Sequence, residues 1–281
     1  MTDQPEQVQS AKEMITGEGQ MRLQGKKIVV TGAGGGIGRA TAEKCAAEGA
    51  RLVCIDLNQS ALQAAVESIR RAGGEAVAIE GDLTSEAACV KMFRQGADAF
   101  GGLDVLFNNA GICLPGDTGP VETSMADWNQ TIAANLTSVF LCCKAGIPYL
   151  LESGNGVIIN NASIVAMVGS AFPQIAYTAA KGGVLAMTRE VAIMYARQKL
   201  RCVAICPGPT ATALVKTFLA DEEAWKLRRR YLPMGRLAEP EEIANVVAFL
   251  ASDEARFVNG SAYTVDGGLT AAYVIDDSQE P

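Results

Sequence analysis

Tyr177 and Lys181 stand four residues apart in a segment whose apolar residues indicate a helix. That spacing places both side chains on one helix face, about 6 Å apart along the helix axis. An ammonium group beside a phenol favours the phenolate, so the pair should lower the tyrosine pKa below its usual value of about 10. Such a tyrosine could exchange a proton with an alcohol or a carbonyl oxygen. Taken alone, the pattern is common and describes an ordinary surface or core pair.

The chain has 281 residues and contains no histidine. Without imidazole, Ser-His-Asp hydrolases, Cys-His proteases and zinc sites with histidine ligands are excluded. Proton transfer near neutral pH must therefore use tyrosine, lysine, a carboxylic acid, cysteine or water. The eight cysteines are scattered and form no Cys-x-x-Cys pair, which predicts buried thiols, no metal site and a reducing compartment.

Charge and hydropathy limit the partners. The formal net charge of −7 gives no support for nucleic-acid binding, which normally needs a basic surface. No apolar run approaches the roughly 18 residues of a membrane span, and residues 1–22 are polar with little periodicity. We expect a cytoplasmic protein with a flexible N-terminal extension over 1–22, no nucleic-acid partner and no membrane partner.

From residue 23 to residue 281, strand-like segments alternate with helix-like segments, and no linker divides them. The predicted strands are Lys27–Thr31, Arg51–Ile55, Glu75–Glu80, Val105–Asn108, Gly156–Asn160, Arg201–Cys206 and Ala262–Val265. The predicted helices are Ile37–Glu48, Ser60–Ala72, Ser85–Phe100, Ala126–Leu151, Ala176–Gln198 and Glu241–Ala251. This alternation predicts an α/β fold: a Rossmann-type doubly wound parallel sheet with helices on both faces, in a single domain.

Helix ends and one irregular stretch complete the predicted outline. Ser60 and Ser85 are candidate N-caps, and Gly73 and Gly101 are candidate helix stops. The stretch 210–237 lacks a strand, and we expect a helical insertion there that borders the substrate.

A glycine-rich loop, Thr31 to Gly38, follows the first predicted strand and precedes a helix. Glycines at such a turn let backbone amides approach a pyrophosphate, and the helix N-terminus favours negative charge. Asp56 ends the second predicted strand, 18 residues after Gly38. That interval fits the spacing of about 20 residues to a ribose-binding carboxylate.

Asp56 also bears on the type of dinucleotide. Its carboxylate can accept hydrogen bonds from both adenosine ribose hydroxyls, and it would repel the 2′-phosphate of NADP. Arg39 follows the loop and could meet such a phosphate, although an exposed residue in the first helical turn is the preferred interpretation. NAD is therefore the predicted cofactor, with NADP less favoured.

Five ordered motifs at predicted strand ends make the sequence resemble a classical short-chain dehydrogenase/reductase over about residues 24 to 270. The family's motifs correspond to Thr31–Gly38, Asn108–Gly111, Ser163 in Asn160–Ser163, Tyr177–Lys181 and Pro207–Gly208. The C-terminal pattern from Pro233–Arg236 through Val265–Gly268 is also typical. The resemblance implies hydride transfer between a nicotinamide and a secondary alcohol or ketone.

The resemblance implies roles for four catalytic residues. Tyr177 would be the acid/base, and Lys181 would lower its pKa and bind the nicotinamide ribose. Ser163 would hold the substrate oxygen with a hydroxyl that can donate and accept. Asn135 would help hold a water that links Lys181 to solvent.

The implied cofactor contacts extend along several strand ends. Besides Tyr177 and Lys181 they are Gly32, Gly35, Gly36, Ile37, Gly38, Asp56, Leu57, Asp82, Leu83, Asn109, Ala110, Gly111, Pro207, Gly208, Thr210 and Thr212. Asp82 and Leu83 would border the adenine. Pro207, Gly208 and Thr210 would flank the nicotinamide.

The substrate is less defined. Tyr177 follows Ser163 by 14 residues, one more than is usual in the family, which weakens any substrate inferred from analogues. Ser163, Val165, Phe172, Tyr177 and Leu214 are the candidate substrate contacts, in a wall that also includes Ile112, Cys113, Leu114 and Gln174. This apolar wall suits an alcohol or ketone of modest size. Acyl-chain, steroid-like, sugar and small cyclic substrates all remain open.

Alternatives to an NAD-dependent dehydrogenase are a non-catalytic dinucleotide-binding regulator and an NADP-dependent 3-oxoacyl-type reductase. Enoyl reduction is disfavoured, because that branch has a longer spacing between tyrosine and lysine. Family resemblance also implies a homo-oligomer, with a tetramer as the expected form and the helices over 126–151 and 176–198 at its interface.

Overall fold

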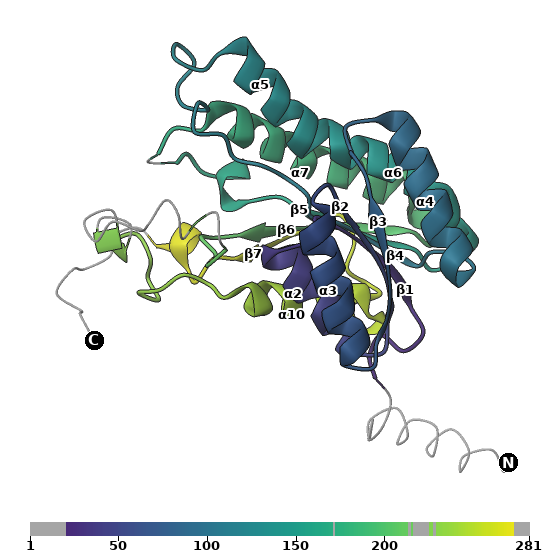
Figure 1. The fold of residues 1–281 in the computed structure, drawn as a ribbon. Coiled ribbons are helices and arrows are strands. Elements are labelled where there is room, and N and C mark those ends of the chain that lie inside the picture. Colours follow the sequence, from purple (N-terminus) through teal and green to yellow (C-terminus); the bar gives the residue numbers. More distant parts are fainter. Residues whose placement is uncertain (1–20, 171, 213–214, 216–224, 227–228, 273–281) are drawn as a thin grey trace, which may run out of the picture.

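The structure is a computed structural model that describes residues 21–170, 172–212, 215, 225–226 and 229–272. Its centre is a sheet of seven parallel strands in the order β3-β2-β1-β4-β5-β6-β7 (Figure 1). The strands are β1 (Lys27–Thr31), β2 (Arg51–Asp56), β3 (Glu75–Glu80), β4 (Val105–Asn108), β5 (Val157–Asn161), β6 (Arg201–Pro207) and β7 (Ala262–Val265). The predicted doubly wound α/β domain is confirmed.

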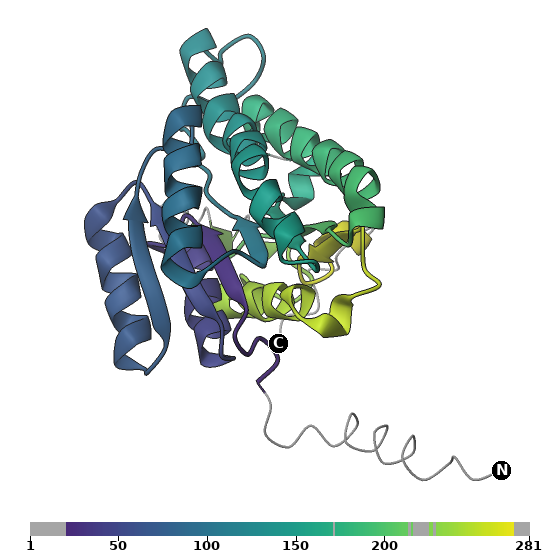
Figure 2. The same cartoon turned by 90° about the vertical axis from the view of Figure 1, so that its right-hand side faces the viewer.

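Helices cover both faces of the sheet (Figures 1 and 2). They are α2 (Gly36–Ala47), α3 (Gln59–Arg71), α4 (Glu86–Phe100), α5 (Met125–Ile132), α6 (Ser138–Glu152), α7 (Ile175–Tyr195) and α10 (Pro240–Ala251). Buried side chains of α2, α3 and α10 form one core cluster with the sheet, and those of α4, α6 and α7 form the other.

The central strands carry runs of apolar residues at consecutive positions because each strand serves both core clusters. Ile28 and Val30 belong to the cluster under α2 and α10, whereas Val29 belongs to the cluster under α4 and α6. Successive strand side chains point to opposite faces, so a strand buried on both sides needs apolar residues at consecutive positions.

The predicted long helix over 126–151 is interrupted. Between α5 and α6 the backbone forms a π-helical turn, Ala133–Thr137, which contains Asn135. The run Met125–Glu152 is long and apolar enough to cross a membrane by length and composition alone. In this structure part of the run lies in the core, because Leu141, Cys142 and Leu150 pack into the cluster on the α4 face.

Helix ends show one correction. Ser85 caps α4 and Gly101 ends it in the left-handed conformation, as predicted. The N-cap of α3 is Asn58 rather than Ser60, because the Asn58 side chain already accepts from the backbone of Ala61 while Ser60 lies inside the first turn. The predicted extension over 1–22 lies almost wholly outside the described residues, as does much of the predicted insertion over 210–237.

Candidate functional site

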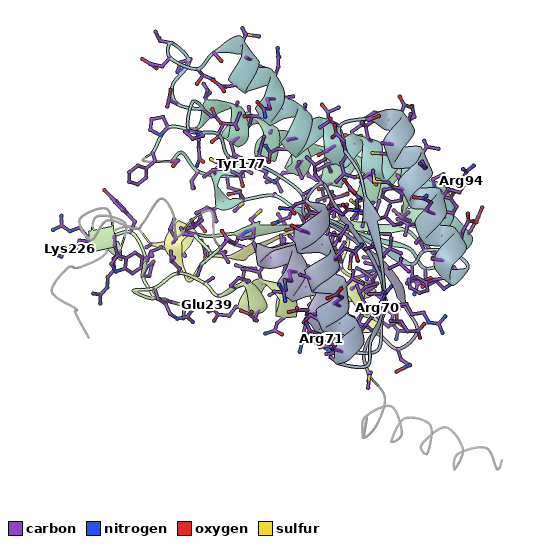
Figure 3. The ribbon with its side chains drawn as sticks, in the orientation of Figure 1. Arg70, Arg71, Arg94, Tyr177, Lys226 and Glu239 are labelled. Carbon is purple, nitrogen blue, oxygen red and sulfur yellow. The ribbon has the colours of Figure 1, made fainter. Side chains whose placement is uncertain are left out.

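The predicted site residues gather at the carboxyl edge of the sheet. The chain runs from β1 outward to β2 and β3, and then returns to place β4 on the other side of β1. In parallel α/β sheets, ligands bind outside the strand ends at such a reversal. Figure 3 shows Tyr177 at this end of the molecule, whereas Arg70, Arg71 and Arg94 lie on helices away from it.

The glycine loop leaves the start of α2 open. Side chains of Asn58, Ser85 and Ser124 cap α3, α4 and α5, but Gly35 offers no capping side chain to α2. Gly35 is exposed, and a Cβ there would meet nothing within 4 Å. The free backbone amides at this helix end, together with the space beside Gly35, fit a pyrophosphate.

Asp56 is bound to the same loop. Its carboxylate oxygens accept from the backbone amides of Gly34 and Asn58, each at 2.8 Å. An ionised carboxylate has further acceptor capacity, so this group can still take ribose hydroxyls. Arg39 is engaged with Glu43 at 2.9 Å, in keeping with the preferred interpretation of an exposed helix residue.

Asn109 connects three strand ends beneath the loop. Its amide nitrogen donates to the carbonyl of Thr31 at 2.9 Å, and its oxygen accepts from Asn161 at 2.9 Å. The hydroxyl of Thr31 accepts from the backbone amides of Asn109 and Ala110. The Asn109 side chain therefore connects the ends of β1, β4 and β5 and stabilises their arrangement around the cleft.

Helix α7 carries the tyrosine and the lysine. Its buried residues Ala176, Ala180, Val184 and Thr188 recur every fourth position, which turns one stripe of the helix onto the sheet. Lys181 lies beside this stripe and is buried. The positions of Tyr177 and Lys181 relative to this buried stripe therefore determine where both side chains lie above the strand ends.

The N-terminus of α7 is capped by a residue from a distant loop. The buried carboxylate of Asp117 accepts from the backbone amides of Ala176 and Tyr177, each at 2.8 Å, and the carbonyl of Thr118 accepts from Ile175. Sequence reasoning missed Asp117, because no local pattern signals a cap that comes from so far away in the chain.

Tyr177, Lys181 and Ser163 are brought together as predicted. The Lys181 Nζ lies 5.4 Å from the centroid of the Tyr177 ring and donates to the carbonyl of Asn161 at 2.7 Å. Ser163 follows β5 and caps a short 3-10 turn (Ile164–Ala166), and its hydroxyl acts on the phenol to lower the Tyr177 pKa. Since an ammonium group has three donors, Lys181 keeps donors beyond the one given to Asn161, a partner that sequence reasoning did not identify.

The prediction of a lowered tyrosine pKa is wrong. Burial raises the pKa of Tyr177 to about 12, Cys113 adds to the rise, and the Ser163 hydroxyl opposes it. Burial also lowers the pKa of Lys181 to about 8. Burial disfavours the charged form of both groups. It therefore disfavours the Tyr177 phenolate and also the Lys181 ammonium that was expected to stabilise this phenolate.

Asn135 lies close to Lys181 but forms no direct hydrogen bond to it among the described residues. Its side chain exchanges hydrogen bonds with the backbone of Ile112 and donates to the carbonyl of Thr131. A Cβ on Gly111 would lie 2.5 Å from the Asn135 Oδ1 and 3.7 Å from the Lys181 Nζ. Asn135 therefore fastens the segment after β4 to the π-helical turn, and its role toward a water stays a prediction.

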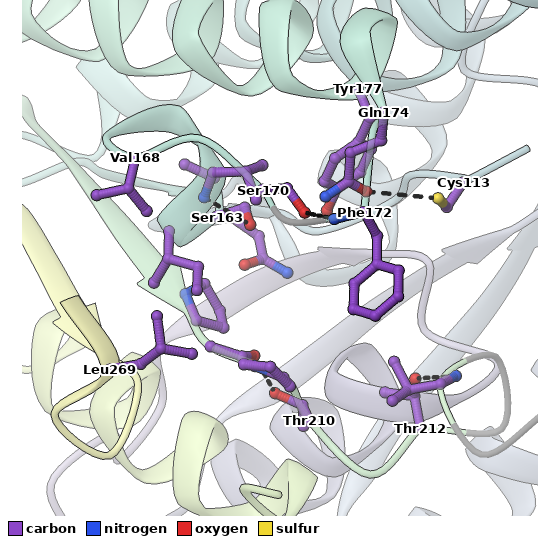
Figure 4. Close-up of a pocket in the computed structure, with 18 of the residues that line it drawn as sticks. Cys113, Ser163, Val168, Ser170, Phe172, Gln174, Tyr177, Thr210, Thr212 and Leu269 are labelled. Atoms are coloured by element: carbon purple, nitrogen blue, oxygen red, sulfur yellow. Dashed lines mark hydrogen bonds between the residues drawn. The ribbon is translucent and has the colours of Figure 1, made fainter. Parts of the chain in front are cut away.

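A pocket of about 510 Å³ opens between α7 and the segment that follows β6 (Figure 4). Predicted residues that line it are Ile37, Cys113, Ser163, Val165, Phe172, Gln174, Tyr177, Pro207, Gly208, Thr210 and Thr212, whereas Ile112 and Leu114 are not among its lining residues. Val168 and Ser170, between Ser163 and Tyr177, and Tyr231, in the predicted insertion, also line it, whereas Asn161 and Leu269 were not among the predicted contacts. Leu214 lies outside the described residues.

The remaining predicted contacts differ in exposure. Leu57 is 70% exposed, whereas the side chain of Leu83 is buried in the cluster on the α4 face. Asp82 is exposed, and one of its oxygens accepts from the backbone and the hydroxyl of Thr84. Thr212 reaches back to the glycine loop, since its methyl group would lie 3.1 Å from a Cβ on Gly36.

The buried amine of Lys181 should affect stability in a defined pH window. Its pKa is about 8 in the folded protein, against 10.5 for an unperturbed lysine side chain. Between these values the unfolded chain holds the proton and the folded chain does not, so this group makes the protein more stable as pH rises. The difference in unfolding free energy between wild type and Lys181→Met should shift by about 1–2 kcal/mol from pH 7.5 to 9.5, in favour of wild type.

Urea unfolding of both proteins at the two pH values measures this shift. Other titrating groups are common to both chains and cancel in the difference. A difference that stays constant with pH would show that Lys181 is not a desolvated amine.

Comparison with known proteins places the chain in a family. Residues 32–270 match the family model described as "Enoyl-(Acyl carrier protein) reductase". The chain is 40% identical over 247 residues to the 2,5-dichloro-2,5-cyclohexadiene-1,4-diol dehydrogenase LinX of Sphingobium indicum, covering 88% of this chain and 97% of that protein. It is 38% identical to the meso-2,3-butanediol dehydrogenase of Serratia marcescens (90% and 97% covered) and 43% identical to the cis-4-hydroxycyclohexanecarboxylate dehydrogenase of Sinomonas cyclohexanicum (86% and 96% covered).

Solved structures of similar fold and sequence also include short-chain dehydrogenases/reductases. A proposed short-chain dehydrogenase/reductase from Burkholderia xenovorans has a TM-score of 0.86 at 37% identity, covering 89% of this chain and 98% of its own. Levodione reductase has a TM-score of 0.84 at 35% identity, with 89% and 99% covered. A proposed 2-deoxy-D-gluconate 3-dehydrogenase from Agrobacterium tumefaciens with bound NADP has a TM-score of 0.82 at 34% identity, with 90% and 100% covered.

The doubly wound sheet and the relatives define the class of protein: an oxidoreductase that binds a nicotinamide dinucleotide. The chain belongs to the short-chain dehydrogenase/reductase family. Although the matching family model is described by enoyl reduction, these three relatives are named as dehydrogenases of hydroxyl-bearing compounds.

Proposed function

We propose that this chain is an NAD(H)-dependent dehydrogenase that interconverts a secondary alcohol and its ketone, with Tyr177 as the acid/base. One observation carries the proposal. The Tyr177 phenol and Ser163 line the same pocket, and the buried Lys181 amine lies 5.4 Å from the centroid of the Tyr177 ring. Relatives named for diol and hydroxyacid substrates support chemistry at a CH-OH group.

In the direction of oxidation, the Ser163 hydroxyl holds the substrate oxygen while the Tyr177 oxygen takes the hydroxyl proton. A hydroxyl suits the first task, because it can donate to a carbonyl or accept from an alcohol. Removing the proton lets the carbinol carbon release its hydride, and in reduction Tyr177 returns the proton to the carbonyl oxygen.

A bound nicotinamide supplies the two-electron chemistry by accepting or returning the hydride. The open start of α2 would hold the pyrophosphate, and Asp56 would hold the adenosine ribose. Lys181 has donors left for the second ribose, and its ammonium form supplies positive charge near the phenol. With a pKa of about 8, this amine carries its proton across the neutral range.

NADH formation over a panel of secondary alcohols tests the proposal. Turnover with at least one alcohol and NAD is the expected result. Dinucleotide binding without turnover of any alcohol or ketone would instead identify a non-catalytic binding protein on this fold.

Cofactor preference should depend on Asp56. Asp56→Asn keeps an oxygen that can accept from a loop amide but removes the negative charge that would repel a 2′-phosphate. We expect the ratio of kcat/KM for NAD over NADP to fall by about tenfold or more, equivalent to about 1.4 kcal/mol. Glu80→Gln is the matched control, since Glu80 pairs with Asp56 across the neighbouring strand. An unchanged ratio in Asp56→Asn would assign cofactor selection to other residues.

We further propose that the protein is a homo-oligomer. Ile193 and Met194 on α7 are 78% and 64% exposed, and Phe140 on α6 is 51% exposed. Large apolar side chains that are exposed on α6 and α7 support a protein contact at these helices, where the interface was expected. Light scattering after gel filtration gives the mass in solution, and a monomeric mass would contradict this proposal.

A further inference from the structure

Beyond the groups already placed in catalysis, the pocket wall near Tyr177 is largely apolar. Val165, Val168, Phe172 and Leu269 line it, and Gln174 contributes a carboxamide. In Figure 4, Gln174 lies beside Tyr177, with Cys113 next to it. A carboxamide among apolar side chains next to the acid/base can select substrates by a hydrogen bond.

Gln174 occupies the N-cap position of α7, three residues before Tyr177. An N-cap side chain commonly accepts from the first helical amides, but Gln174 makes no such bond. The carboxylate of Asp117 already accepts from Ala176 and Tyr177. The first backbone amides of α7 thus have Asp117 as their hydrogen-bond acceptor, and the Gln174 side chain can face the pocket instead.

The orientation of the Gln174 amide follows from Cys113. The Cys113 thiol donates to the Gln174 Oε1 at 3.8 Å, so the carboxamide oxygen faces the thiol. Within the described part of the chain, the Nε2 group has no hydrogen-bond partner. Since a carboxamide nitrogen carries two N–H donors, the pocket has an unused donor next to the phenol.

We propose that Gln174 binds a second oxygen of the substrate, so that the enzyme prefers small alcohols that carry another hydroxyl or carbonyl oxygen. This inference rests on the dehydrogenase function proposed above. Tyr177 and Ser163 bind the reacting oxygen, the Gln174 Nε2 donates to the second oxygen, and Val165, Val168 and Phe172 contact the carbon skeleton. A substrate with one oxygen would leave the amide donor without a partner, which lowers its binding free energy.

Matched pairs of alcohols test the inference. Butane-2,3-diol is compared with butan-2-ol, and cyclohexane-1,4-diol with cyclohexanol, by kcat/KM with NAD. In wild type we expect at least one diol to exceed its mono-alcohol by about tenfold, the value of one hydrogen bond. Gln174→Met keeps the length of the side chain but has no N–H, so this ratio should fall to near one. Gln198→Met, on an exposed turn after α7, is the control and should keep the wild-type ratio.

Binding provides a second readout that does not depend on turnover. Saturation-transfer NMR with NADH-bound protein should show stronger contact for the diol than for the mono-alcohol in wild type, and equal contact in Gln174→Met. If wild type oxidises alcohols without preferring either diol, or if the preference survives in Gln174→Met, the role of Gln174 is wrong while the dehydrogenase function stands. If no alcohol or ketone is turned over, the dehydrogenase function is wrong, and the NMR comparison still decides whether Gln174 binds a second oxygen.

Discussion

Tyr177→Phe should lower kcat by roughly 10²–10⁴-fold, the usual contribution of a positioned acid/base. The substitution removes one oxygen and keeps the ring that packs near Lys181. Binding of NADH and the melting temperature should therefore stay close to wild type. Steady-state kinetics with the best alcohol, together with NADH titration by fluorescence, measure both effects.

Tyr195→Phe is the matched control, because Tyr195 ends the same helix and does not line the pocket. It should retain wild-type kcat. Near-normal turnover by Tyr177→Phe would refute the proposed mechanism, since in a chain without histidine few other groups could replace the phenol.

Two alanine substitutions in the glycine loop should affect different properties: Gly38→Ala should lower the stability of the fold, and Gly35→Ala should weaken dinucleotide binding. A Cβ on Gly38 would lie 2.0 Å from the carbonyl oxygen of Gly32 and 2.6 Å from the Asn109 amide, which is an impossible contact. Overpacking of this kind costs roughly 1–3 kcal/mol, so Gly38→Ala should lower the melting temperature by several degrees. The damage falls on the folded protein itself, whether or not a dinucleotide is bound.

Gly35→Ala should instead leave the folded protein unchanged and weaken dinucleotide binding. Gly35 has an extended backbone with a φ of −164°, which any residue adopts, and its Cβ would point into open space. That space lies beside the uncapped start of α2, where we place the pyrophosphate. We expect a wild-type melting temperature and a Kd for NADH raised by about tenfold or more. Wild-type binding by Gly35→Ala would show that the pyrophosphate does not pass Gly35.

Features that depend on neighbours along the chain could be predicted from the sequence. Strands β1, β3, β4 and β7 begin and end where their apolar runs and flanking polar residues indicated. Ser85 and Gly101 bound α4 because capping and left-handed stops depend on a few local residues. For α3, the sequence offers two polar residues that could cap the helix. Asn58 is the N-cap in the structure, because its side chain accepts from the backbone amide of Ala61.

Features that depend on distant contacts could not be predicted. The π-helical turn carries Asn135, whose side chain bonds to the backbone of Ile112 on a separate loop, a contact that no local pattern indicates. The pKa of Tyr177 depends on burial by the folded chain, whereas its spacing from Lys181 shows only that the two can meet. Gln174 was expected in the cleft wall, but its free amide depends on Asp117, which no local pattern connects to α7.

The Asp117 contact has a consequence for how this enzyme can diversify. The carboxylate joins the loop that carries Cys113 directly to the first turn of the helix that carries Tyr177. Any insertion or shift that reshapes this loop would also move the Tyr177 phenol, so selection should hold the loop's length and path nearly fixed. Residues 164–170 also contribute to the pocket wall, and within the described part of the chain no hydrogen bond joins them to α7. New substrate ranges should therefore evolve, and be engineered, through changes in that segment.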